Sequence, residues 1–173
     1  MNNLLKEELI SVFDEIQVDI SAENQMAIIV NKEAVLSVLS FLKNHGYGHL
    51  ALISCVDWIE EKTLELVYIL SAYLGEDGEY TDKERINIIL KTKIPREKPD
   101  FLSVIPVFEN AEPYEREIHE LYGIRFEGHP RLTPLFLERE YKTPPFRKDF
   151  DTREYVKYVF DSIPFVEEKA GNK

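Results

Sequence analysis

The chain has 173 residues, of which 44% are hydrophobic and 31% charged, with one cysteine and a formal net charge of −11. This composition is too hydrophobic for a disordered chain, and the negative charge argues against a protein that wraps nucleic acid. A single cysteine excludes an intrachain disulfide and an all-cysteine iron–sulfur cluster held by this chain alone. Cys55 lies in an apolar run, which predicts a buried, inert thiol.

The N-terminal residues show no basic stretch followed by an apolar core, so no signal peptide is expected. The longest apolar runs are far shorter than the roughly 20 residues that cross a bilayer. We therefore expect a cytosolic chain that reaches a membrane only through a partner.

The first part of the chain predicts two helices that flank a pair of short strands. Apolar residues recur at helical spacing over 4–13, and segments 16–20 and 26–30 are typical of strands joined by a turn. Asn31 is suited to cap the next helix, whose apolar stripe covers 35–42.

Three longer strands are predicted at 49–58, 64–73 and 85–93. The links between them, 59–63 and 74–80, are short, which favours an antiparallel meander. We therefore expect an α+β body with helices on one face of a mostly antiparallel sheet.

The next predicted helix has clear start and stop signals. Pro113 suits the first helical position, and Glu112, Glu115 and Glu117 lie where the positive end of the helix dipole favours acids. Gly123 is a natural C-terminal stop.

The chain changes character after residue 123. Residues 124–173 contain five prolines and too many apolar side chains for a solvated tail. Residues 1–123 hold 11 basic and 23 acidic residues, whereas 124–173 hold 10 and 9, so the net charges are −12 and +1. These features predict an α+β body over 1–123 and an extended, proline-rich docking arm over 124–173, with a short helix at 151–160.

Two patterns suggest chemistry and also have simpler explanations. Glu115 and His119 are four residues apart on one helix face, and with His129 they would make three metal ligands, as in a small metal-dependent enzyme. The same residues also belong to an ordinary charged helix face, in which Arg116 lies four residues from an acid on either side.

Segment 146–150 places two cations between aromatic residues, a pattern that binds single-stranded nucleic acid in some proteins. Here the cations are few and Asp149 and Asp151 flank them, so docking onto an acidic protein partner is the favoured interpretation.

A longer motif carries a family resemblance. Residues 114–132 read Tyr-Glu-Arg-Glu-Ile-His-Glu-Leu-Tyr-Gly-Ile-Arg-Phe-Glu-Gly-His-Pro-Arg-Leu, and residues 146–150 read Phe-Arg-Lys-Asp-Phe. Together they resemble two motifs of the thirty-kilodalton subunit family of respiratory complex I, whose bacterial members are the C subunits of NADH-quinone oxidoreductases. Weaker matches begin near Cys55, so the resemblance covers about residues 50–150.

The resemblance implies a cofactor-free α+β subunit with no catalytic residues of its own. Such a subunit lies on the cytoplasmic face of the cell membrane as a peripheral protein. It is held there by a hydrogenase-like large subunit and an iron–sulfur subunit, and these partners would carry the NiFe centre and the iron–sulfur clusters. It meets membrane subunits only through the complex and binds no nucleic acid. The residues that the resemblance implies as structural and docking residues are Glu115, Arg116, Glu117, Glu120, Gly123, Gly128, His129, Pro130, Phe146, Arg147, Lys148 and Asp149.

Some positions depart from the respiratory pattern. Pro113 stands where the family has an aromatic residue, and Thr133 and Pro134 replace an arginine pair. These departures are more similar to the homologous subunits of membrane-bound, energy-converting NiFe hydrogenases. We therefore expect the hydrogenase branch, with the C subunit of an NADH-quinone oxidoreductase or a related archaeal respiratory complex as the alternative.

Overall fold

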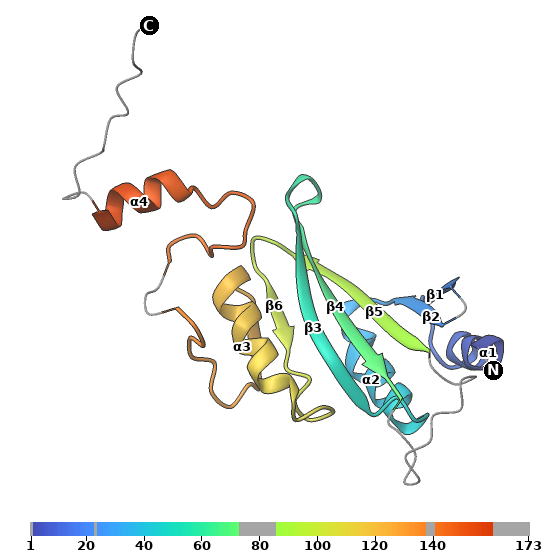
Figure 1. Cartoon of the computed structure of the whole chain (residues 1–173). Helices are drawn as coiled ribbons and strands as arrows, with labels where there is room; N and C mark the ends of the chain where they lie inside the picture. Colours follow the sequence, from blue (N-terminus) through green and yellow to red (C-terminus); the bar gives the residue numbers. More distant parts are fainter. Residues whose placement is uncertain (1, 23, 73–85, 138–140, 161–173) are drawn as a thin grey trace, which may run out of the picture.

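A five-stranded mixed sheet in the order β1-β2-β5-β4-β3 forms the centre of the molecule (Figure 1). The computed structural model describes residues 2–22, 24–72, 86–137 and 141–160. The strands are β1 (Gln17–Ala22), β2 (Gln25–Ile29), β3 (His49–Trp58), β4 (Thr63–Ser71) and β5 (Asn87–Pro95). The α+β class predicted from the sequence is confirmed.

The predicted antiparallel meander is present in β3, β4 and β5, and β1 also pairs with β2 in antiparallel fashion. The pairing of β2 with β5 is parallel, with Ile28 opposite Leu90, and it makes the sheet mixed. The predicted link 74–80 and the predicted strand ends at 73 and 85 lie outside the described residues.

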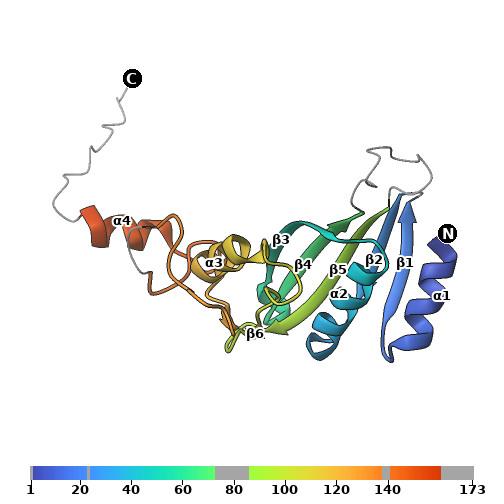
Figure 2. The same cartoon turned by 90° about the horizontal axis from the view of Figure 1, so that it is seen from below.

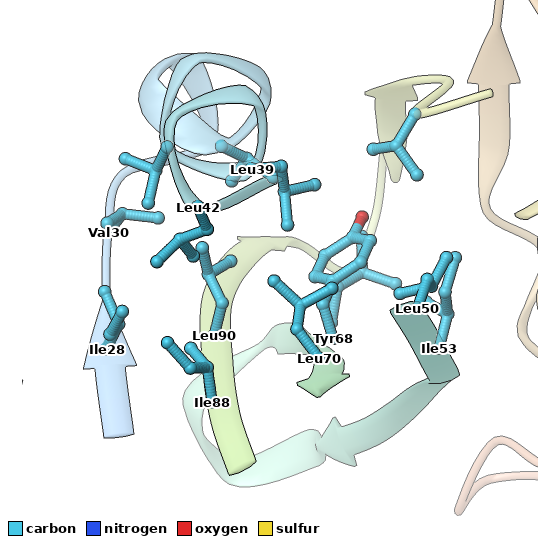
Figure 3. Packing of buried hydrophobic residues seen from close by; sticks show 14 of the residues in the cluster. Ile28, Val30, Leu39, Leu42, Leu50, Ile53, Tyr68, Leu70, Ile88 and Leu90 are labelled. Carbon is cyan, nitrogen blue, oxygen red and sulfur yellow. The ribbon is translucent and has the colours of Figure 1, made fainter. Parts of the chain in front are cut away.

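The core lies on one face of the sheet. Inward-pointing side chains alternate along each long strand, so that Ile53, Tyr68 and Leu90 are neighbours across β3, β4 and β5 and all are buried. Leu39 and Leu42 of α2 (Val35–Asn44) lie over these strands (Figure 3). Burial of this apolar surface is the main stabilising term for the body.

Both predicted N-terminal helices are present. α1 (Asn2–Val12) lies beside β1, and a single 3₁₀ turn, η1 (Lys32–Ala34), precedes α2 (Figure 2). Asn31 lies at the N-cap position of η1, as predicted for the start of this helix, but its side chain makes no cap hydrogen bond; its amide nitrogen donates to Glu15 Oε2 at 2.7 Å.

A second, two-stranded parallel sheet was not predicted. β6 (Asp100–Leu102) pairs with β7 (Arg125–Glu127), and α3 (Ala111–Tyr122) connects them in the chain. Phe101 and Phe126 pack edge to face between the two strands. This unit lies beside the outer strand β3, as Figure 1 shows.

The start of α3 differs from the prediction, and its end agrees with it. The helix begins at Ala111, which makes Pro113 its third residue; the first turn still tolerates a residue without an N–H. Gly123 ends the helix in the left-handed region at φ +76°, and its N–H donates to His119 O at 2.8 Å. The boundary after residue 123 stays a prediction, although Phe126, just beyond it, is buried in the core.

The predicted helix near the C-terminus is present as α4 (Thr152–Phe160). It lies at the opposite end of the molecule from α1 (Figures 1 and 2). Segment 161–173 lies outside the described residues, so the extended arm as a whole stays a prediction. In the part of the chain that the structure describes, no helix is long and apolar enough to cross a membrane.

Candidate docking interface

A buried carboxylate joins the C-terminal segment to the sheet. Asp57 lies near the end of β3 and is 3% exposed. Arg96, just after β5, donates from Nε to Oδ1 at 2.8 Å and from Nη2 to Oδ2 at 3.0 Å. The backbone N–H of Lys148 donates to Oδ2 at 2.8 Å. Two strand ends and the segment that contains residue 148 therefore meet at one side chain.

Arg96 extends this contact to a second acid of the C-terminal segment. Its Nη2 lies 2.6 Å from Asp149 Oδ1. Burial pushes the pKa of Asp57 up, but the hydrogen bonds from Arg96 and Lys148 outweigh it and hold this pKa below its ordinary value. The Arg96 hydrogen bond likewise lowers the pKa of Asp149. Both acids are therefore charged at neutral pH, and we call Asp57, Arg96, Lys148 and Asp149 the Asp57 cluster.

The end of α3 binds the same segment through its backbone. Phe146 N–H donates to Leu121 O at 3.0 Å, and Arg147 Nε donates to Tyr122 O at 2.7 Å. These carbonyls belong to the last turn of the helix, where they have no helical partner and where a cation is favoured. Burial, together with the charge of nearby Arg96, lowers the pKa of Arg147.

Gly123 makes this close approach sterically feasible. A Cβ at this position would lie 2.8 Å from Pro144 Cγ and 3.3 Å from Arg147 Nη2. The glycine that the sequence marks as a helix stop is therefore also a packing site for the C-terminal segment.

Glu120 and Arg116 hold the chain that returns along the outside of α3. The Glu120 carboxylate accepts hydrogen bonds from three consecutive backbone N–H groups, those of Leu135, Phe136 and Leu137. Arg116 donates to the carbonyl oxygens of Thr133 at 3.0 Å and Pro134 at 2.8 Å. One acid and one base on the same helix thus satisfy the donors and acceptors of a loop without regular structure.

His129 pins the turn that begins this loop. Its Nδ1 accepts from Arg131 N–H at 3.0 Å, so Nε2 carries the proton that is shared with Glu112 O at 3.2 Å. Gly128, at φ +85°, makes the turn before it, and Pro130 is exposed after it.

Glu115 lies on α3 and is fully buried. Its Oε1 accepts from Val104 N–H at 2.6 Å, and its Oε2 has no hydrogen-bond partner among the described residues. Burial raises the pKa of Glu115 to about 7, and the Val104 hydrogen bond and the nearby Ser103 hydroxyl only partly offset this. Glu117 is half-buried on the same helix.

The structure does not bring the three suggested metal ligands together. Glu115 bonds Val104, His119 Nδ1 lies 2.8 Å from Ile124 O, and His129 bonds Glu112 and Arg131. Over the described ranges, no group of three or more His, Cys, Asp or Glu side chains is arranged to hold a metal ion.

The buried, inert thiol is confirmed. Cys55 is 4% exposed, and burial, with a contribution from nearby Asp57, raises its pKa to about 12. A thiol of this kind is neutral and unreactive at physiological pH.

The sequence did not single out Asp57 and Arg96, the centre of the interface. A signal was present, because Asp57 continues the inward-facing alternation of Ile53 and Cys55 along β3. A carboxylate at an inward position needs a cationic partner, but its partner Arg96 is 39 residues away in the chain.

Comparison with known proteins identifies the family. Residues 28–156 match the model of the family described as "Respiratory-chain NADH dehydrogenase, 30 Kd subunit". The chain belongs to this family. The matched range contains the Asp57 cluster and the whole of α3, so the contacts described above lie within the family region.

Two relatives with established names illustrate the range of the family. The C subunit of the F420H2 dehydrogenase of Methanosarcina mazei is 36% identical over 124 residues, which cover 70% of this chain and 73% of that protein. The C subunit of the NADH-quinone oxidoreductase of Neorickettsia sennetsu is 28% identical over 159 residues, which cover 90% and 81%.

Solved structures share the fold. A chain of the membrane-bound sulfane sulfur reductase, an archaeal respiratory membrane complex, superposes with a TM-score of 0.79 and 26% identity over 99% of this chain and 98% of that one. A trypsin-resistant fragment of Nqo5 superposes with a TM-score of 0.62 and 23% identity, covering 76% of this chain and 100% of the fragment. The second likeness concerns the fold alone.

Proposed function

We propose that this chain is a non-catalytic structural subunit in the hydrophilic arm of a membrane-bound redox complex that couples electron transfer to ion translocation. The observation that carries the proposal is that most polar groups of the family motif bond within the chain and hold its C-terminal segment against the body. Glu120, Arg116 and Arg147 each bond backbone groups of the chain itself. Groups used in this way position a polypeptide, and they are not free for acid–base chemistry.

The family resemblance suggests the partners. A hydrogenase-like large subunit would be braced by the C-terminal segment, and an iron–sulfur subunit would lie beside it. The iron–sulfur clusters would belong to these partners, as would the NiFe centre if the complex is of the hydrogenase type, with no cofactor in this chain. The subunit would be peripheral on the cytoplasmic face of the membrane and would meet the membrane subunits only through the complex.

Two branches remain candidates for the complex. The energy-converting hydrogenase type is supported by Pro113, Thr133 and Pro134, which depart from the respiratory pattern. The respiratory type is supported by the near-complete coverage of the sulfane sulfur reductase chain and by the F420H2 dehydrogenase relative. Because the second observation spans the whole chain and the first only three positions, we favour an archaeal-type respiratory complex, and the hydrogenase type is the second candidate.

An affinity tag on the chain in its native cell tests the role. We expect membranes solubilised in mild detergent to yield the tagged chain together with the redox complex, and Arg147→Ala to weaken this association. The isolated chain should hold no stoichiometric nickel, iron or flavin; finding any of them would overturn the proposal. The metal and quinone motifs of the co-purified large subunit then distinguish the two branches.

A further inference from the structure

Two exposed phenylalanine rings flank the last turn of α3. Phe136 is 68% exposed and Phe146 is 58% exposed. The backbone N–H of Phe136 donates to the Glu120 side chain at 2.9 Å, and that of Phe146 donates to Leu121 O at 3.0 Å. Two segments ten residues apart thus attach to adjacent positions of one helix turn.

The backbone at each ring is held, although the ring itself is open to solvent. Glu120 binds Phe136 together with the N–H groups on either side of it. Phe146 has a hydrogen-bonded backbone and packs edge to face on Tyr122, with ring centroids 5.9 Å apart. Side chains presented on a fixed backbone lose little conformational entropy when they bind, which makes them suitable anchors.

The basic side chains near the two phenylalanine rings indicate which kind of partner surface would bind them. The exposed Lys142 and Lys148 lie in the segment of Phe146, and Arg131, in the segment of Phe136, has a side chain that is 67% exposed and whose Nη2 lies 3.7 Å from Glu112 Oε1. Two acids of this region are already paired, Glu120 with backbone N–H groups and Asp149 with Arg96. A complementary surface therefore has apolar pockets for the rings and an acidic rim.

We propose that Phe136 and Phe146 form the anchor of this chain on an acidic-rimmed apolar pocket of a neighbouring protein subunit. This inference deepens the proposed function and rests on it. Two aromatic side chains on loop segments held at one helix turn are point anchors of the kind that dominate protein–protein interfaces. A helix that lies on a membrane surface instead presents a continuous apolar stripe beside many cations. The charged side chains of the family motif thus hold the backbone of the two segments in place, and the phenylalanine rings contact the partner.

Assembly measurements on the tagged chain in its native membranes test the anchor. Truncation of an aromatic anchor at an interface commonly weakens binding about tenfold or more. We expect Phe136→Ala to lower recovery of the chain with the solubilised complex by about this factor, and the double variant with Phe146→Ala to lower it further. Leu4→Ala is the matched control, because Leu4 is also 68% exposed but lies on α1 at the opposite end of the molecule.

Photocrosslinking separates the kinds of partner. With p-benzoylphenylalanine in place of Phe136 or Phe146, we expect both positions to crosslink to one and the same neighbouring subunit, which is not a copy of this chain. The same probe in place of Leu4 should not crosslink to that subunit. Crosslinks to a second copy of this chain, adducts with lipid only, or unchanged recovery of Phe136→Ala would each overturn the inference. If the unsubstituted chain does not co-purify with a membrane redox complex, the proposed function itself fails.

Discussion

Arg96 and Asp57 form a two-point ion pair in which Nε lies 2.8 Å from Oδ1 and Nη2 lies 3.0 Å from Oδ2. The pair joins the ends of β5 and β3, which are separated by β4 in the sheet. It also binds the C-terminal segment, because Lys148 N–H bonds Asp57 and Arg96 bonds Asp149. The stability of the sheet end and the placement of that segment therefore depend on the same charges.

Replacing Asp57 with Asn tests this dependence. The change removes the two-point partner of the largely buried Arg96 and leaves it only Asp149, whose side chain is 46% exposed. Removal of one member of a buried pair costs about 3 kcal/mol. We expect urea unfolding of the purified chain to show this loss, with faster proteolysis around residues 141–150. Glu61→Gln is the control: it breaks an ion pair with Lys93 that is exposed on both sides, and it should leave stability unchanged. Equal effects of the two substitutions would contradict the role of Asp57.

Gly123→Ala tests the packing of the C-terminal segment on the end of α3. Any L-residue at φ +76° is strained, and here the new methyl group also meets Pro144 Cγ at 2.8 Å. Gly46→Ala is the matched control, because Gly46 has φ +93° and a Cβ there would meet nothing within 4 Å. We expect both variants to lose about 1–2 kcal/mol from backbone strain, and Gly123→Ala to lose a further ~1–3 kcal/mol from overpacking. Thermal or urea unfolding measures the difference, and equal losses would show that Pro144 does not pack there.

Glu120→Ala tests whether one carboxylate holds the loop over residues 135–137. Its removal leaves three N–H groups without their acceptor, and a hydrogen bond to a charged group contributes about 1.5–3 kcal/mol. We expect the amide hydrogens of residues 135–137 to exchange roughly tenfold faster or more, while those of the central strand β4 are unchanged. Glu117→Ala, on the same helix, should not alter the exchange of these amides. Protection that persists in Glu120→Ala would contradict this account.

Glu115 gives the protein a distinct pH dependence. Its pKa is about 7 in the folded chain and 4.5 ordinarily, so between these values the folded state binds a proton that the unfolded state has released. Stability should therefore fall as the pH rises from about 4.5 to 7, by about 3 kcal/mol at most. Glu115→Gln keeps the acceptor for Val104 N–H and removes the charge, so we expect it to abolish this slope and to stabilise the chain at pH 8.

Unfolding free energies at pH 5 and pH 8 check this expectation. Glu117→Gln is the control and should keep the slope of the unsubstituted chain, because this carboxylate is only half-buried. A slope that is the same in Glu115→Gln would assign the pH dependence to another group.

The elements predicted well were those with local signals. The apolar periodicity of α2, the alternation in β3 and β4, and the stop at Gly123 all depend on residues close together in the chain. A local signal was incomplete where a distant residue oriented the same side chain. Asn31 lies at the start of η1, but its amide nitrogen bonds Glu15, sixteen residues away, and its side chain makes no cap hydrogen bond.

The tertiary arrangement decided what those local signals left open. The parallel pairings of β2 with β5 and of β6 with β7 join segments that are far apart in the chain. Because no short turn connects such strands, the sequence contains no local signal that predicts their pairing. The same is true of the interface. The motif at 114–132 was visible, but its role as an internal support follows only when Arg116 and Glu120 are seen bonding the backbone of residues 133–137.

The sequence by itself determined the fold class, the family resemblance, the buried Cys55 and the contrast between an acidic body and a nearly neutral C-terminal part. These properties depend on composition and short-range pattern. Only the tertiary structure decided which charged groups pair within the chain and which side chains remain exposed to solvent. The reason is physical: a carboxylate such as Asp57 has no preferred partner until folding removes it from water and brings Arg96 and Lys148 N–H within hydrogen-bonding distance.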